Sequence, residues 1–316
     1  MSARESKERL STVPDFSAAF LMPKYWLLWI GLFLFYCLSW MPSKVLDRLG
    51  DTLGNYTARK NKKRFRIANT NLSLCFPDKT ADEIQQLVEA HFRAQARATL
   101  QYAKIWWQPI SALRKHIDVV GLERVQKVID DGGHVIILLC HSVSLDVAIA
   151  ALSMRVKSSG PYKPFRNALL DWLVANRRIR FGGIIFTRED GLRPIIKSIR
   201  AGRVLIYPAD EDLGAERCIF APFYGVQKAT VPVLGRLAKT TKSKVFTCMS
   251  CYDAEQSKYI VNVLPHIEGL DGEDDLSDTQ AMNASVEQAV NYCPTQYMWT
   301  LRLFKTRPEG ESSVYG

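Results

Sequence analysis

The chain has 316 residues, 47% of them hydrophobic and 23% charged, which suits one large domain or two small ones and excludes wholesale disorder. Its net charge of +10 favours acidic partners, and nucleic acid, anionic lipid and acidic proteins all qualify. The seven cysteines are scattered, so we expect no disulfide framework. This pattern indicates a reducing compartment.

The first predicted element is a membrane-anchoring helix over residues 23–42, after an N-terminal tail of residues 1–22. Residues 25–41 carry no charge and reach roughly 25 Å as a helix, slightly less than a hydrocarbon core. The segment is therefore a marginal transmembrane helix or a deep interfacial anchor. A signal peptide is disfavoured because the run starts late and ends without a small-residue cleavage site.

A basic segment, residues 59–66, follows with six cations in eight positions. It is either a solvated helix face or a clamp on an anionic membrane surface, and its place after the anchor favours the clamp. The excess of cations places this side of the membrane in the cytoplasm, although the flank before the anchor is basic too. No zinc finger or other nucleic-acid signature accompanies the charge, so we expect no nucleic-acid partner.

Residues 43–316 are predicted to form a single α/β domain with a helical N-terminal part, residues 43–118. Residues 81–104 have helical periodicity, and His91 on their apolar stripe is interpreted as a core histidine. Beyond them, short apolar runs alternate with helix-like segments, which predicts a mixed, largely parallel central sheet flanked by helices. The predicted strands are residues 135–140, 184–186, 204–207, 245–247 and 259–264. The predicted helices are residues 167–178, 192–201, 231–239 and 277–291, the last capped by Ser277.

Cys248 and Cys251 have the C-x-x-C spacing of redox and zinc sites. No second pair follows, and both lie in an apolar, strand-like run. We therefore interpret them as core residues and expect no metal.

His141 directly follows the predicted strand 135–140, and the carboxyl ends of such strands line the clefts of α/β folds. Asp146 comes five residues later, where a strand-to-helix turn would let its carboxylate accept from one imidazole nitrogen. The other nitrogen would then be a better base for a hydroxyl that attacks a thioester. Taken alone, the pattern favours a structural histidine beside a helix cap made by Ser142 or Ser144.

Three later stretches change that balance. Residues 183–188, 207–212 and 220–225 resemble, in order and spacing, the G-x-x-F-x-R and aromatic-Pro-x-acid blocks of the glycerolipid-type H-x4-D acyltransferases. This resemblance implies a glycerolipid-acyltransferase-like fold.

Further blocks over nearly the whole chain resemble the late lipid A acyltransferases, the lauroyl and myristoyl transferases of Gram-negative outer-membrane biogenesis. They lie at residues 14–16, 23–26, 69–77, 180–183, 230–237, 296–299 and 305–310. Asp rather than Glu at position 146, the pair Gly182-Gly183 and the Thr230-x-Pro232 motif are closest to the myristoyltransferase branch.

The resemblance implies transfer of a fatty acyl chain from acyl carrier protein to the 3-hydroxyl of an acyl chain on a Kdo-bearing lipid A precursor. No cofactor is expected besides this acyl-thioester co-substrate. His141 would be the general base and Asp146 its orienting partner. The residues with implied substrate contacts are Arg188, Asp210, Lys163 and Arg180. The enzyme would sit on inner-membrane lipid with its active domain on the cytoplasmic face, where its positive charge would attract the acidic carrier protein.

Two positions depart from the family pattern. Lys163 stands where many members have Arg, which keeps the charge and loses bidentate geometry. Glu211 follows Asp210 where many have Gln, which adds a negative charge near the expected cleft.

Several alternatives remain open at this stage. The donor is myristoyl, lauroyl or 3-hydroxyacyl. Cys140 or Ser142 is a less favoured nucleophile for an acyl-enzyme hydrolase or transferase, since Cys140 belongs to the apolar run. A membrane-surface scaffold without chemistry is disfavoured by the intact His141 and Asp146 pair.

Overall fold

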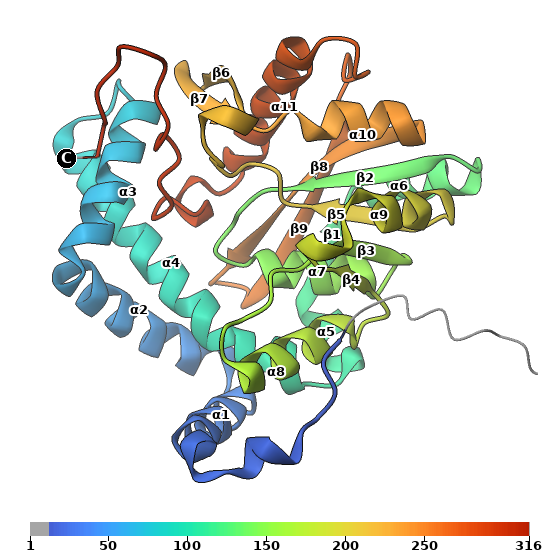
Figure 1. Ribbon diagram of the computed structural model, residues 1–316. Helices are drawn as coiled ribbons and strands as arrows, with labels where there is room; N and C mark the ends of the chain where they lie inside the picture. Colours follow the sequence, from blue (N-terminus) through green and yellow to red (C-terminus); the bar gives the residue numbers. More distant parts are fainter. Residues whose placement is uncertain (1–12, 316) are drawn as a thin grey trace, which may run out of the picture.

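The computed structural model describes residues 13–315, so residues 1–12 of the predicted tail lie outside the described part. A central sheet has helices on both faces, and a layer of long helices runs along one side of it (Figure 1). The helices of that layer and the anchor region are α1 Trp26–Ser39, α2 Ser43–Lys60, α3 Lys62–Cys75, α4 Ala81–Trp107 and α5 Ile110–His116. The helices that cover the sheet are α6 Leu122–Asp130, α7 Leu145–Ser153, α8 Ala168–Ile179, α9 Leu192–Arg200, α10 Val233–Thr241 and α11 Asp275–Val290.

Seven strands form the central sheet in the order β1-β9-β8-β2-β5-β3-β4. They are β1 Ile117–Val120, β2 His134–Leu139, β3 Ser158–Pro161, β4 Ile184–Phe186, β5 Val204–Tyr207, β8 Ser243–Asp253 and β9 Lys258–His266. Neighbouring strands are parallel except β8 and β9, which pair antiparallel. The predicted mixed, largely parallel sheet is therefore confirmed. A separate hairpin, β6 Ile219–Phe223 and β7 Val226–Thr230, was not predicted, because its alternation is weak and Pro222 interrupts it.

Strand β2 shows why the sheet needs helices on both faces. Its alternate residues Ile136 and Leu138 pack in one core with α9, α10 and α11, whereas Ile137 and Leu139 pack in a second core with α6 and α7. All four are completely buried. An unbroken apolar run is what a strand covered on both faces requires.

The predicted helix 81–104 is confirmed as α4, which a capping box between Thr80 and Glu83 begins. His91 on this helix is fully buried and its Nδ1 lies 2.9 Å from the Thr295 carbonyl, which confirms it as a core histidine. Helix α11 begins earlier than predicted, because the Asp274 side chain rather than Ser277 accepts from the first backbone amides.

Helix α1 lies within the predicted anchor segment and packs on the domain by one face only. Leu32 on its inner face is buried against Leu169 and Leu173 of α8. The outer face is apolar and exposed along its length: Trp26, Leu27, Ile30, Phe33 and Leu34 are each more than half exposed. Within residues 13–315, no helix combines the length and the apolar character needed to cross a membrane.

Candidate active site

The site lies where two neighbouring parallel strands end. Strands β2 and β5 pair with Ile137 opposite Ile206, so their carboxyl ends reach the same edge of the sheet. His141 is the second residue after β2, and Asp210 is the third after β5. The fold thereby joins two side chains that are 69 residues apart in sequence.

His141 contacts two carboxylates. Its Nδ1 is hydrogen-bonded to Asp210 Oδ1, and its backbone amide donates to Asp210 Oδ2 over 2.9 Å. Its Nε2 lies 3.2 Å from Glu211 Oε1. The His141 side chain is 17% exposed, so the ring is accessible from one side while Asp210 is enclosed. Asp210 therefore orients the ring through Nδ1, and Nε2 faces Glu211, whose side chain is 48% exposed.

The structure corrects the expected partner of His141. The Asp146 carboxylate lies in the first turn of α7 and accepts a hydrogen bond of 2.7 Å from Arg178 of α8. Both His141 ring nitrogens are occupied by Asp210 and Glu211. The short sequence spacing from His141 to Asp146 was misleading because the turn after β2 directs the two side chains to different neighbours.

Two further groups, besides His141, hold Asp210 in place. The Tyr297 hydroxyl donates to its Oδ2 over 2.8 Å, and the Lys228 ammonium donates to its backbone carbonyl over 2.8 Å. Lys228 lies on β7 and is completely buried, with its ammonium 5.1 Å from the centre of the Phe223 ring. A buried lysine is expensive without a partner, and the hydrogen bond to the Asp210 carbonyl, together with the nearby charge of the Asp210 carboxylate, offsets part of that cost. Sequence reasoning missed Lys228 and Tyr297, although Tyr297 lies in a block that carried the family resemblance.

The charges at the site reinforce one another. Burial alone would lower the pKa of His141, but the charge and hydrogen bonds of Asp210 and Glu211 outweigh it and raise that pKa to about 10. Burial would raise the pKa of Asp210, yet the charges of His141 and Lys228 hold it well below its usual range. His141 therefore carries a proton on both nitrogens at neutral pH in this arrangement.

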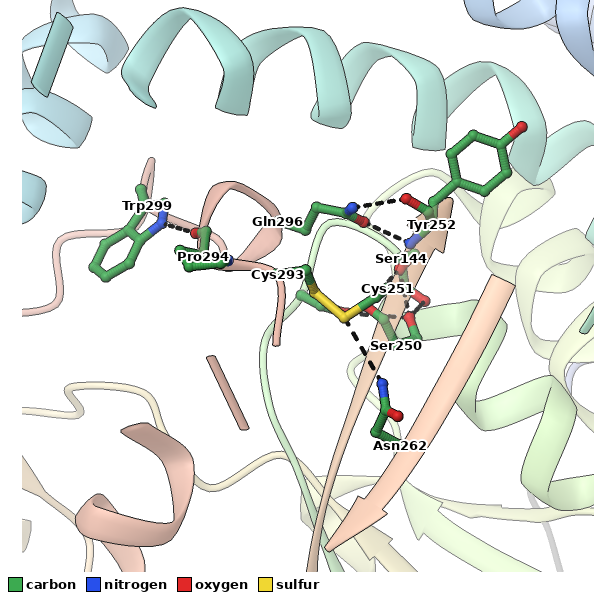
Figure 2. Close-up of a disulfide and its surroundings, with 10 residues drawn as sticks. Ser144, Ser250, Cys251, Tyr252, Asn262, Cys293, Pro294, Gln296 and Trp299 are labelled. Carbon is green, nitrogen blue, oxygen red and sulfur yellow. Dashed lines mark hydrogen bonds between the residues drawn. A yellow bond between two sulfur atoms is a disulfide. The ribbon is translucent and has the colours of Figure 1, made fainter. Parts of the chain in front are cut away.

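The segment of residues 293–299 clamps the turn that carries His141. The Met298 amide donates to the His141 carbonyl, and the Val143 amide donates to the Gln296 carbonyl, each over 2.8 Å. Figure 2 shows how this segment is anchored: the Gln296 side chain bonds both backbone groups of Tyr252, and a disulfide joins Cys251 to Cys293.

This disulfide was not expected from the sequence, which indicated a reducing compartment and core packing for the C-x-x-C motif. Cys248 is indeed buried with a free thiol. Cys251 lies on the opposite face of β8 and forms the disulfide with Cys293. The partner is 42 residues away in sequence, so spacing offered no signal.

The structure places the other residues predicted to bind substrate, Lys163, Arg180 and Arg188, in separate surroundings. Lys163, exposed after β3, is close enough to Glu211 to lower the pKa of that carboxyl, after the larger effect of the His141 hydrogen bond. Arg180 points elsewhere and donates to the carbonyls of Ile105 and Gln108 at the end of α4. Arg188 begins a short 3-10 helix after β4, and its side chain lies outside the described part.

Nucleophilic catalysis by Cys140 or Ser142 finds little support in the geometry. Both side chains are buried, and burial raises the pKa of the Cys140 thiol well above its usual value. A thiol acts as a nucleophile through its thiolate, which this position disfavours. In the part of the chain that the structure describes, no group of three or more His, Cys, Asp or Glu side chains is arranged to hold a metal ion.

Comparisons with known proteins identify the family of the chain. The family model for bacterial lipid A biosynthesis acyltransferases matches residues 13–306. The chain belongs to this family. A lipid A biosynthesis acyltransferase of Haemophilus influenzae is 34% identical to it over 96% of this chain and 95% of the relative.

Two Escherichia coli relatives are the lipid A biosynthesis myristoyltransferase and lauroyltransferase. Each is 31% identical, with 98% and 97% of this chain covered and 96% and 100% of the relatives. This acyltransferase is thus equally similar to relatives named for different acyl chains. It is an enzyme of lipid A biosynthesis, and the pattern of identity does not separate its acyl donor from theirs.

Proposed function

We propose that this acyltransferase moves a fatty acyl chain from acyl carrier protein to the 3-hydroxyl of an acyl chain on a Kdo-bearing lipid A precursor. The observation that carries the proposal is the pairing of His141 with Asp210 at the edge of the sheet. A histidine whose Nδ1 is held by a buried carboxylate is the arrangement of a general base for a hydroxyl, which acts through Nε2 once that nitrogen has lost its proton.

In this mechanism the His141 Nε2 takes the proton of the acceptor hydroxyl while the hydroxyl oxygen attacks the thioester carbonyl. The tetrahedral intermediate collapses, the ester bond forms and the carbon–sulfur bond breaks. The departing thiolate of the carrier protein recovers the proton from His141. Asp210 holds the ring and stabilises the imidazolium, so no acyl-enzyme is needed.

Asp146 takes a different place in this proposal from the one expected. It positions Arg178, whose guanidinium also lies 5.6 Å from the centre of the Tyr162 ring. Arg178 and Lys163 are cations suited to the phosphates of the acceptor. Arg188 remains a candidate contact by family resemblance, and Arg180 is assigned to the end of α4.

Membrane attachment belongs to the same proposal. The outer face of α1 offers a continuous apolar surface, and the basic segment of residues 59–66 spans the junction of α2 and α3. We assign both the apolar face of α1 and the basic segment to contacts with the cytoplasmic face of the inner membrane, where both substrates meet. Replacing Leu27, Phe33 and Leu34 by Glu should release the protein from vesicles that contain anionic lipid, whereas replacing the buried Leu32 should destabilise the fold instead.

The deciding experiment uses the purified full chain with lauroyl, myristoyl, palmitoleoyl and 3-hydroxymyristoyl carrier proteins. The acceptor is the Kdo-linked precursor with and without an earlier secondary acyl chain, and product mass identifies donor and acceptor together. We expect a myristoyl-type late step. His141→Ala should lose at least ~10²-fold in kcat/KM. Near-normal turnover by that variant would sink the mechanism, and an acyl-enzyme trapped in a single turnover would replace it by nucleophilic catalysis.

A further inference from the structure

We propose that Glu211 is a positioning residue that occupies the Nε2 side of His141 in the free enzyme and gives way to the acceptor hydroxyl. The inference rests on the proposed function, because it concerns the atom that would act as the base.

The first observation is the place of the carboxylate. Glu211 Oε1 lies 3.2 Å from Nε2, within the range at which a hydroxyl oxygen must approach its base. The neighbouring Asp210 is locked by Lys228 and Tyr297, whereas the Glu211 side chain is 48% exposed. One carboxylate is therefore fixed and the other is at the surface of the site, free to be exchanged for substrate.

The second observation is the charge around the pair. The groups that face His141 and its carboxylates are Asp210 and Glu211 after β5, Cys140 after β2, Lys228 on β7, Tyr297 in the C-terminal segment and Lys163 after β3. Two carboxylates share one imidazole, so the ring is doubly protonated at neutral pH and has no lone pair for a hydroxyl. Removal of the outer carboxylate lowers the pKa of His141, so Nε2 releases its proton to solvent and regains the lone pair of a base, while Asp210 still holds Nδ1.

The acceptor supplies a reason for the exchange. Its phosphates repel the Glu211 carboxylate and attract Lys163, which already interacts with that carboxylate. Binding of an anionic acceptor therefore weakens the hold of Glu211 on His141 as the hydroxyl arrives. An enzyme built this way keeps its base protonated until the acceptor is present.

The test compares pH profiles of kcat/KM for the wild type, Glu211→Gln, Glu211→Asp and a matched control, Glu216→Gln. Glu216 is an exposed carboxylate in the loop between β5 and β6, so the control removes the same charge from the same loop. Loss of a carboxylate beside Nε2 lowers the pKa of His141, so the acid limb of Glu211→Gln should move to lower pH by about 1 unit or more. Glu216→Gln should leave the limb in place, and Glu211→Asp should restore most of the wild-type profile.

Two outcomes overturn the inference. An acid limb that stays in place in Glu211→Gln shows that the carboxylate does not hold Nε2 in the free enzyme. A loss by Glu211→Gln as large as that of His141→Ala at every pH shows that Glu211 takes part in the chemistry instead. Nitrogen-15 NMR titration of histidine in the same variants, with His141 assigned by substitution, needs no turnover. It tests the contact even if the proposed acyl transfer fails.

Discussion

The sharpest prediction concerns which carboxylate supports the base. Asp210→Asn preserves the shape of a buried side chain and removes the charge that faces the His141 Nδ1. The ring loses its fixed tautomer and the stabilisation of its imidazolium. Asp146→Asn instead weakens a single ion pair with Arg178. In that pair the Arg178 side chain is 25% exposed and the Asp146 side chain is 20% exposed.

The expected magnitudes differ widely. A general base and its support contribute about 10²–10⁴-fold, so Asp210→Asn should lose that much in kcat/KM, or about 3–5 kcal/mol of transition-state stabilisation. Asp146→Asn should lose about tenfold or less, because a partly exposed ion pair contributes on the order of 1 kcal/mol.

The assay is acyl transfer from myristoyl carrier protein to the Kdo-linked precursor at saturating and limiting acceptor. Thermal unfolding of each variant is measured alongside, since Asp210 also pairs with Tyr297 and a backbone-bound lysine. Asp210→Asn should lower kcat, whereas Asp146→Asn should mainly raise KM for the acceptor. If Asp146→Asn loses as much kcat as Asp210→Asn while both remain folded, the geometry around His141 has been misinterpreted and the sequence-based pairing is the active one.

Three further results are expected. Because the pKa of His141 is raised from about 6.5 to about 10, its contribution to stability is fully present below pH 6.5 and is lost as the pH rises to 10. The free energy of unfolding of the wild type, measured with denaturant, should therefore fall over that pH window more than that of His141→Gln. The same pH dependence in both proteins would contradict the charge assignment. Replacing Cys251 and Cys293 together by Ser should cost about 4 kcal/mol under oxidising conditions, by the entropy of a loop of 42 residues, and nothing under strong reduction. Gly54→Ala should cost about 1–3 kcal/mol because its Cβ would lie 2.5 Å from the α4 backbone, whereas Gly31→Ala, with open space around it, should be neutral or slightly stabilising.

Much of the fold follows from local pattern. Helical periodicity located α4, and short unbroken apolar runs located the main strands. Such runs are expected because a strand of a parallel sheet is buried on both faces. The hairpin β6–β7 escaped, since its alternation is weak and Pro222 interrupts β6. Helix α1 was located, but only the tertiary structure shows that its inner face packs on α4 and beside α8.

The site divides in the same way. Sequence alone identified His141 and Asp210 as polar residues that follow buried strands, and the family motifs marked both. It could not show that β2 and β5 are neighbours, because strand order is decided by long-range packing of a chain whose strands look alike. The nearest carboxylate in sequence, Asp146, was therefore assigned to His141, and the nearest in space proved to be Asp210. The tertiary structure also decided what Glu211 does: side by side with Asp210 in sequence, it reaches the other nitrogen of the same ring.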